Sequence, residues 1–240
     1  MGVTGSQRDR GSVVFTAWVA TVLLVVIPPL WIALALTSSR ERAMHRVRRW
    51  ARRVFAWCGC SLQITGLHNL EPERGAIIVA NHSSYLDSVV LLAVITSDYR
   101  FVANHRELAR PFVGFVLRKG RHLIVDRGSV RSRGACMQAM LEALERGTSL
   151  VLFPEGTRSA SRLQAFKIGA FHAAFRSGRP IVPVAIAGTE RILPRHRRLL
   201  RRADVAITIL PRIYPGTDSP DAAQLREHTA TAIASVLDGS

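Results

Sequence analysis

Short runs rich in apolar and β-branched residues recur along the chain after Ser61, and helical patterns separate several of them. The clearest helical patterns lie at 132–146 and 166–177. Strands that alternate with helices predict a mostly parallel sheet covered by helices on both faces. The expected fold class is therefore α/β, a mostly parallel sheet flanked by helices, with strands expected at 62–65, 76–80, 100–103, 123–126, 149–153, 181–186 and 205–210.

Two polar stretches follow directly after predicted strands. Asn81-His82 comes after the run 76–80, and Pro154-Glu155 comes after the run 149–153. In sheets of this kind, ligands bind at the carboxyl ends of the strands. The sequence therefore predicts a functional site that contains both stretches.

His82 and Asp87 are five positions apart, so on a regular helix they would point about 140° away from each other. They can meet only if His82 lies in a strand-to-helix turn and Asp87 in the first turn of the helix. The carboxylate would then fix the imidazole tautomer and leave the second ring nitrogen as a base. Ser83 and Ser84 are expected to cap this helix. The alternative is that His82 satisfies a turn and Asp87 caps a helix.

The chain offers no nucleophile of its own beside His82. It has no G-x-S-x-G elbow, and no cysteine is suitably placed. The three cysteines, Cys58, Cys60 and Cys136, do not have the spacing of a zinc site, and their odd number argues against a disulfide framework. We therefore expect reduced thiols, and a nucleophile that comes from the substrate.

The stretch "LVLFPEGTRS" at 150–159 ends a hydrophobic strand with charged and small residues. Gly156 permits close approach to the backbone, and Arg158 offers a planar fork to a phosphate. The alternative is an ordinary solvated turn.

The segment 13–36 contains no charged residue over 24 positions, enough for roughly 36 Å of helix. Pro28-Pro29 interrupts it, which predicts two half-segments rather than one spanning rod. A pattern with Met44, Val47 and Val54 on one side and arginines on the other then predicts a basic amphipathic helix at a membrane interface. A cleaved signal peptide is the alternative, but seven arginines within the next 17 residues oppose export. Residues 1–60 are therefore expected to form a retained anchor.

The formal net charge of +16 indicates an anionic partner. A nucleic-acid binder is disfavoured, because only 7% of the residues are aromatic and no recognition motif is present. The arginine-rich stretch 191–202 fits anionic lipid head groups, or forms a solvated face.

Together these stretches resemble the glycerolipid acyltransferase family that acylates lysophosphatidic acid. Its N-H-x-x-x-x-D motif is matched by Asn81, His82 and Asp87. Further family motifs are matched by "VDR" at 125–127, "FPEGTRS" at 153–159, "FKIGAFHAA" at 166–174 and "RPIVPVAIAGT" at 179–189. The resemblance covers nearly all of the chain after Ser61, and it divides the chain into an anchor at 1–60 and an α/β acyltransferase domain at 61–240.

This resemblance implies transfer of a fatty acyl group from acyl-CoA or acyl carrier protein to the free hydroxyl of 1-acyl-sn-glycerol 3-phosphate. His82 would remove the hydroxyl proton, and Asp87 would orient His82. Backbone N–H groups near the helix start would hold the oxyanion. No metal or other cofactor is expected, because sulfur already activates the carbonyl carbon. The expected substrate-binding residues are Asn81, Arg106, Arg127, Glu155, Gly156, Thr157 and Arg158.

One position departs from the family pattern. Asn104 stands in "FVANHREL" where the family often has a lysine that helps to hold the acceptor phosphate. Arg106 is expected to take over that role, or the acceptor is a different lyso-lipid, such as a lysophospholipid or a lyso-aminolipid. A membrane scaffold with an inactive site is disfavoured because both main motifs are intact. The expected location is the cell membrane, with the catalytic domain on the cytoplasmic side, where thioester donors are found.

Overall fold

The computed structural model describes residues 3–70, 75–158, 163–194 and 199–239. Within these ranges the chain forms a seven-stranded sheet in the order β1-β7-β6-β2-β5-β3-β4. Neighbouring strands are parallel except β6 and β7, which confirms the predicted α/β fold. The strands are β1 (Leu62–Thr65), β2 (Ile77–Ala80), β3 (Tyr99–Asn104), β4 (Leu123–Val125), β5 (Ser149–Leu152), β6 (Ile181–Ala187) and β7 (Val205–Ile209).

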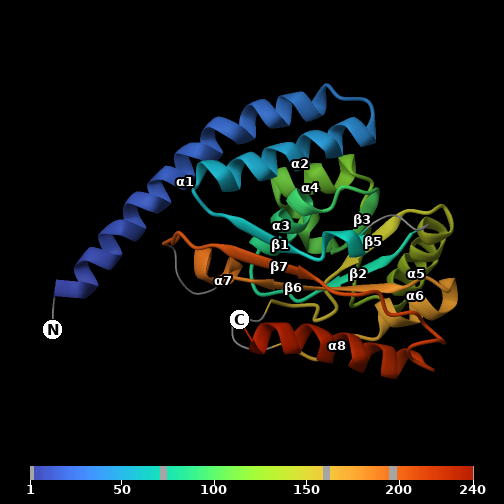
Figure 1. Ribbon diagram of the computed structural model, residues 1–240. Helices are drawn as coiled ribbons and strands as arrows, with labels where there is room; N and C mark the ends of the chain where they lie inside the picture. The colour runs from blue at the N-terminus through green and yellow to red at the C-terminus, as the bar shows by residue number, and fades with distance from the viewer. Residues whose placement is uncertain (1–2, 71–74, 159–162, 195–198, 240) are drawn as a thin grey trace.

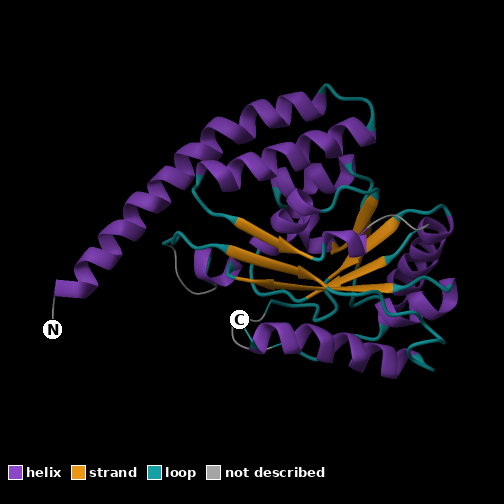
Figure 2. Ribbon diagram, in the orientation of Figure 1, coloured by secondary structure: helices purple, strands orange, loops and turns teal. Residues whose placement is uncertain are grey.

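Helices cover both faces of this sheet (Figures 1 and 2). One layer contains α1 to α4, and the other contains α5, α6 and α8. The helical patterns noted at 132–146 and 166–177 correspond to α5 and α6. The helices are α1 (Val3–Ala35), α2 (Arg40–Trp57), α3 (Leu86–Val94), α4 (Pro111–Lys119), α5 (Val130–Glu145), α6 (Gly169–Ser177), α7 (Thr189–Ile192) and α8 (Ala222–Asp238), with short 3-10 helices η1 (Leu67–Leu70) and η2 (His105–Ala109).

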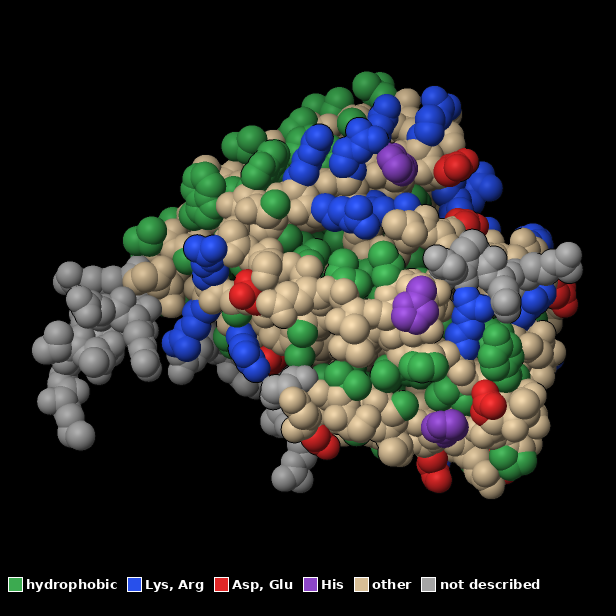
Figure 3. Space-filling model, viewed as in Figure 1, with side chains coloured by type: hydrophobic (Ala, Val, Ile, Leu, Met, Phe, Trp, Pro, Cys, Tyr) green, Lys and Arg blue, Asp and Glu red, His purple; other side chains and the backbone are tan. Residues whose placement is uncertain are grey.

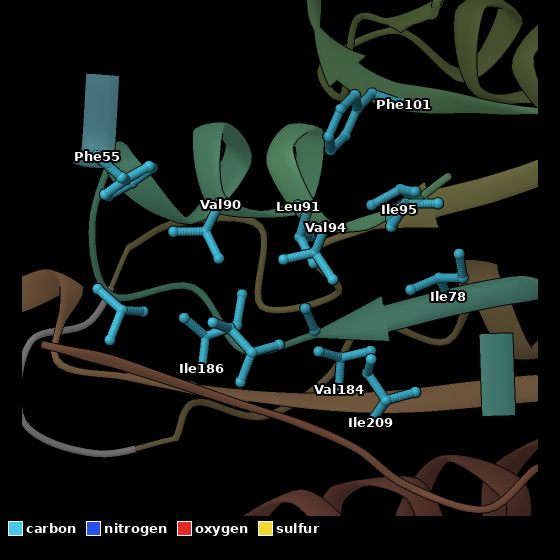
Figure 4. Close-up of a cluster of buried hydrophobic side chains, with 14 of the residues drawn as sticks. Phe55, Ile78, Val90, Leu91, Val94, Ile95, Phe101, Val184, Ile186 and Ile209 are labelled. Carbon is cyan, nitrogen blue, oxygen red and sulfur yellow. The ribbon is translucent and has the colours of Figure 1, made fainter. Parts of the chain in front are cut away.

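The central strand β2 is buried on both faces, as a parallel strand between two helical layers must be. Ile78 and Ala80 point into a cluster with Val90 and Leu91 of α3, part of which is drawn in Figure 4. Ile77 and Val79 point to the other side, into a cluster formed with α5, α6 and α8. The carboxyl end of β2 is therefore fixed from both sides, and the chain leaves it at Asn81.

The first helix is continuous, which corrects the expectation of two half-segments. α1 runs for 33 residues through Pro28 and Pro29. Both prolines lie on its exposed side, while a stripe on the opposite side is buried at every fourth position. Packing of that stripe outweighs the hydrogen bonds that the prolines remove. The stripe consists of Val22, Val26, Leu30 and Leu34.

The predicted amphipathic helix α2 is present, but its apolar side faces the protein rather than a membrane. Val47 packs against Leu30 and Leu34 of α1, and Phe55 joins the main cluster with α3. Two of its basic side chains hold it in place, since Arg48 and Arg52 donate to the carbonyls of Thr96 and Ala93 at 2.8 and 2.5 Å. These carbonyls lie at the end of α3, where cations are favoured. The expected contact of α2 with a membrane through its apolar side is therefore wrong.

The outer side of α1 exposes a large apolar surface. Figure 3 shows hydrophobic side chains along this helix and basic side chains beside it on α2. The segment Gly11–Ala35 is long and apolar enough to cross a membrane. The large exposed apolar residues of α1 and the loop after it are Val13, Val14, Trp18, Leu23, Leu24, Val25, Trp31, Ile32 and Leu36.

A buried histidine next to β4 makes stability depend on pH. The Nδ1 atom of His122 accepts a hydrogen bond from the backbone N–H of Phe101 at 3.0 Å. Burial, assisted by the positive charges of Arg40 and Arg100, lowers the pKa of His122 from 6.5 to about 4. The unfolded chain therefore binds a proton at higher pH than the folded chain, so stability falls as the pH drops from about 6.5 towards 4.

We expect the lowered pKa of His122 to reduce the free energy of unfolding by about 3 kcal/mol at pH 4 relative to pH 7. Urea unfolding of the wild type and of His122→Gln, at both pH values in the same detergent, measures the difference between their pH dependences. Glutamine keeps a hydrogen-bond acceptor but cannot take up the proton. Parallel loss of stability in the two proteins would show that His122 does not carry this pH dependence.

Candidate active site

The turn between β2 and α3 brings His82 and Asp87 together. β2 ends at Ala80 and α3 begins at Leu86, so His82 lies in the turn and Asp87 in the first turn of the helix. The Nδ1 atom of His82 is 2.8 Å from the Oδ2 atom of Asp87. The two side chains thus meet in the way that their spacing predicts.

Asp87 is fully buried, and hydrogen bonds surround its carboxylate. Its Oδ2 atom accepts from the backbone N–H groups of Ser83 at 2.7 Å and Ser84 at 2.8 Å, as well as facing His82. Its Oδ1 atom accepts from the hydroxyl of Thr189, which is also fully buried. A buried charge is tolerated only with such partners. Together these hydrogen bonds hold the carboxylate of Asp87 in a single orientation.

These contacts correct the expected oxyanion site. The N–H groups of Ser83 and Ser84 point at Asp87, and the N–H of His82 donates to the Oε1 atom of Glu155 at 2.6 Å. These three backbone donors of the turn therefore serve the protein's own carboxylates. Ser84 contributes to the start of α3, since its hydroxyl accepts a hydrogen bond from the N–H of Leu86 at 3.3 Å.

The imidazole of His82 is fixed on a second side by an aromatic ring. It stacks on Phe153 with ring centroids 4.1 Å apart and an interplanar angle of 18°. The His82 side chain is 17% exposed, so it reaches solvent. With Nδ1 directed to Asp87, the Nε2 atom is left for a substrate.

Phe153 and Thr189 contact the histidine and aspartate, although the motifs alone gave them no role. Each follows the carboxyl end of a strand, β5 for Phe153 and β6 for Thr189. That position is the signal that could have identified them, because the ends of parallel strands share one edge of the sheet.

Asn81 was expected to bind substrate, but its side chain binds the backbone of β6. The carboxamide donates to the carbonyl of Ile186 and accepts from the N–H of the same residue, both at 2.8 Å. The side chain is buried. Asn81 therefore fixes the start of the His82 turn against the neighbouring strand.

Glu155 connects two loops of the site. Its Oε1 atom accepts from the N–H of His82 at 2.6 Å, and its Oε2 atom accepts from the N–H of Gln164 at 3.0 Å. Burial raises the pKa of this carboxyl above its usual value. Glu155 thus shapes the site through backbone contacts. Thr157 does so through a side chain, since its hydroxyl donates to the Oε1 atom of Gln164 at 3.0 Å.

Two cations gather at Gly156. Arg127 donates from Nη1 to the carbonyl of Gly156, and burial lowers the pKa of this guanidinium. A Cβ atom built on Gly156 would lie 2.7 Å from the Nη1 atom of Arg127 and 2.8 Å from the Nζ atom of Lys167. The sequence motifs predicted Arg127 here but gave no role to Lys167.

The other two predicted cations make different contacts. The guanidinium of Arg158 lies over the ring of Tyr85, with its Cζ atom 3.3 Å from the ring centroid. Arg106 is exposed on η2, and its N–H donates to the Oδ1 atom of Asn104 at 3.0 Å. Asn104 therefore caps η2. Ser159, the last residue of the motif "FPEGTRS", lies outside the described residues.

Comparison with known proteins identifies the family. The Acyltransferase family model matches residues 61–187, which is more than half of the chain. The chain belongs to this acyltransferase family. The strands β2, β5 and β6, whose carboxyl ends form the candidate site, lie within the matched region.

The acyltransferase has relatives in algae, plants and bacteria. It is 28% identical to a 1-acyl-sn-glycerol-3-phosphate acyltransferase of Chlamydomonas reinhardtii, over 94% of this chain and 69% of the relative. It is 31% identical to a chloroplastic enzyme of the same name from Brassica napus, over 87% of this chain and 62% of the relative. For the enzyme of that name from Escherichia coli the identity is 34%, over 67% of this chain and 64% of the relative. The chain thus spans roughly two thirds of these relatives.

The fold has also been solved in a relative. The crystal structure of the 1-acyl-sn-glycerophosphate acyltransferase from Thermotoga maritima superimposes with a TM-score of 0.80 and 23% identity. The match covers 97% of this chain and 96% of the other. It includes most of α1 and α2, so the N-terminal helices belong to the shared fold.

Gly156→Ala is expected to reduce acyl transfer about tenfold or more, because losing one charge-assisted hydrogen bond costs about 1.5–3 kcal/mol. The φ angle of Gly156 is +79°, and a methyl group there would displace Arg127 and Lys167. Acyl-transfer rates and thermal unfolding measure the two effects separately. The matched control is Gly169→Ala on α6, where a Cβ atom meets nothing within 4 Å. Equal rates in both variants would contradict a role for the cation pair.

Proposed function

We propose that this protein is an O-acyltransferase acting on 1-acyl-sn-glycerol 3-phosphate. It moves a fatty acyl group from acyl-CoA or acyl carrier protein to the free hydroxyl, giving phosphatidic acid. The observation that carries this proposal is the pairing of His82 with a fully buried, fully hydrogen-bonded Asp87 at a sheet edge rich in cations. The names of the relatives support the same acceptor.

The reaction needs one proton acceptor and no nucleophile from the protein. As the acceptor hydroxyl oxygen attacks the thioester carbonyl, His82 takes the hydroxyl proton on Nε2. Asp87 stabilises the imidazolium that forms. A carbon–oxygen bond forms, the carbon–sulfur bond breaks, and the proton passes from His82 to the leaving sulfur. The thioester is reactive enough that this chemistry requires no metal and no cofactor besides the donor.

The acceptor phosphate is proposed to bind the cations beside the turn. Arg127 and Arg158 follow β4 and β5, whose carboxyl ends lie on the same edge as that of β2. Charge-assisted bonds from guanidinium groups suit a phosphate dianion. Lys167 extends this set at Gly156.

A second acceptor is favoured by one observation. Asn104 caps η2 and offers no charge where the family often has a lysine. Acylation of a different lyso-lipid, a lysophospholipid or a lyso-aminolipid, is therefore the alternative. Comparison of kcat/KM for these acceptors with that for 1-acyl-sn-glycerol 3-phosphate, with both kinds of donor, decides between them.

The exposed side of α1 is proposed to hold the enzyme on the cytoplasmic leaflet. Its buried stripe is already packed against the protein, so the helix is best placed along the membrane surface with its outer side in lipid. Arg202 donates to the carbonyl of Gly59 at 2.6 Å, and the N–H of Leu200 donates to the hydroxyl of Thr16 in α1 at 2.8 Å. The described part of the arginine-rich stretch thus lies beside α1, near anionic head groups; its residues 195–198 lie outside the described ranges.

His82→Ala should lower kcat about 10²–10⁴-fold, the usual contribution of a general base. Asp87→Asn should lose less than His82→Ala, because it removes the negative charge but leaves the imidazole. Steady-state acyl transfer with saturating donor measures both. His172→Ala, an exposed position on α6, is the control. The assignment is wrong if His82→Ala keeps wild-type kcat while its fold is intact.

The membrane contact is tested on the outer side of α1, because deleting the helix would uncover the buried stripe. Combined substitution of Leu24, Val25 and Ile32 by serine should weaken binding to anionic vesicles more than tenfold, since each buried side chain contributes about 1.5–3 kcal/mol. Val130→Ser on α5, whose side chain is also exposed, is the control. Vesicle co-sedimentation measures binding. Unchanged binding of the triple variant would refute membrane contact through the outer side of α1. Digestion of the domain by external protease on intact cells would refute its location on the cytoplasmic side.

A further inference from the structure

The imidazole of His82 lies against the face of an aromatic ring. Its centroid is 4.1 Å from that of Phe153, and the two ring planes differ by 18°. The face of a benzene ring carries partial negative charge, and its edge carries partial positive charge. The stack therefore places the histidine over the electron-rich side of Phe153, where a positive charge is favoured.

Charged groups of both signs also surround this histidine. Asp87 of α3 faces its Nδ1 atom, and the carboxylate of Glu155 accepts from its backbone N–H. The cations Arg127 and Lys167 gather at a glycine of the same loop that contains Phe153. A positive charge on the imidazole is therefore favoured by the two carboxylates and opposed by the two cations.

An aromatic ring stabilises a cation without adding a charge of its own. A further carboxylate in the place of Phe153 would also favour the imidazolium, but it would pair with the neighbouring cations and repel an anionic acceptor. The ring of Phe153 avoids both effects because it has no net charge. Phe153 is also half-buried, and partial exclusion of water strengthens the attraction between a ring and a cation.

We propose that the ring face of Phe153 stabilises the imidazolium form of His82 during acyl transfer. The imidazole becomes positive when Nε2 takes the proton of the acceptor hydroxyl, and it becomes neutral again when that proton passes to the leaving sulfur. Phe153 favours the charged state between these two steps and so makes His82 a stronger base. It acts through His82 and is a positioning residue. This inference rests on the proposed function, because it concerns the same proton transfer.

A purely steric role for Phe153 makes a different prediction. If the ring only filled space beside His82, a fluorinated ring of nearly the same shape would serve equally well. Fluorine withdraws electrons from the ring face, so it weakens the attraction for a cation while it keeps the packing. Weaker stabilisation of the imidazolium lowers the maximal rate. It also moves the acidic limb of the pH profile to lower pH, because the neutral base then persists there.

The experiment uses the full-length enzyme in mixed micelles, with Phe153 replaced by mono-, di- and trifluorophenylalanine. We expect kcat to fall with each added fluorine, about threefold or more in total, and the midpoint of the acidic limb of kcat/KM to move down by about half a pH unit. The ring NMR signal of His82, identified by its absence from His82→Ala, should titrate with the same downward shift and reports without turnover. Phe153→Leu, which has no ring, should resemble the trifluorinated enzyme. The matched control is the same series at Phe101, whose ring centroid lies 6.5 Å from that of Phe153, and it should leave both readouts unchanged.

The outcomes separate this inference from the proposed function. Transfer by the wild type that the fluorinated rings at Phe153 leave unchanged overturns the inference alone. A lower kcat with an unmoved acidic limb and an unmoved NMR titration also overturns it, as does an equal effect of fluorine at Phe101. If the wild type transfers no acyl group to 1-acyl-sn-glycerol 3-phosphate, the proposed function fails, and the NMR titration of His82 still decides whether the ring stabilises the imidazolium. If Phe153→Leu does not fold, the trifluorinated enzyme decides, since it keeps the shape of the ring.

Discussion

The carboxylate of Asp87 is the charge around which the candidate active site is organised. It is wholly buried, so it requires hydrogen-bond donors on both oxygens, and the turn after β2 provides those of Oδ2. The backbone N–H groups of Ser83 and Ser84 point inward to meet it, and Thr189 at the start of α7 donates to Oδ1. The need for these hydrogen bonds fixes the conformation of the turn, and the turn in turn fixes the position of His82.

Further hydrogen bonds connect the turn to the neighbouring segments of the sheet edge. Asn81 bonds the turn to β6, and Glu155 bonds it to the loop after β5. Each uses backbone groups of a neighbouring segment, so the site depends on the parallel strands β2, β5 and β6 ending together. The imidazole is thereby held by hydrogen bonding on Nδ1 and by the Phe153 ring on one face. Such preorganisation lowers the cost of placing a base for proton transfer.

The sequence predicted the strands and the meeting of His82 with Asp87, because both depend on local pattern and spacing. It did not predict which donors would surround Asp87, since those donors come from a backbone shape that only the packed turn defines. The continuity of α1 through Pro28 was missed for a related reason. Local proline chemistry favours a break, whereas the buried side of the helix depends on α2 and the sheet.

The central claim is that His82 activates the acceptor hydroxyl directly, with no acyl group passing through the protein. It is tested most directly by mixing the enzyme with an acyl thioester in the absence of acceptor and following free thiol within the first turnover. The account predicts no burst of thiol and an unchanged protein mass, then rapid thiol release when 1-acyl-sn-glycerol 3-phosphate is added. A burst equal to the enzyme concentration, with one acyl group added to the protein, would contradict it.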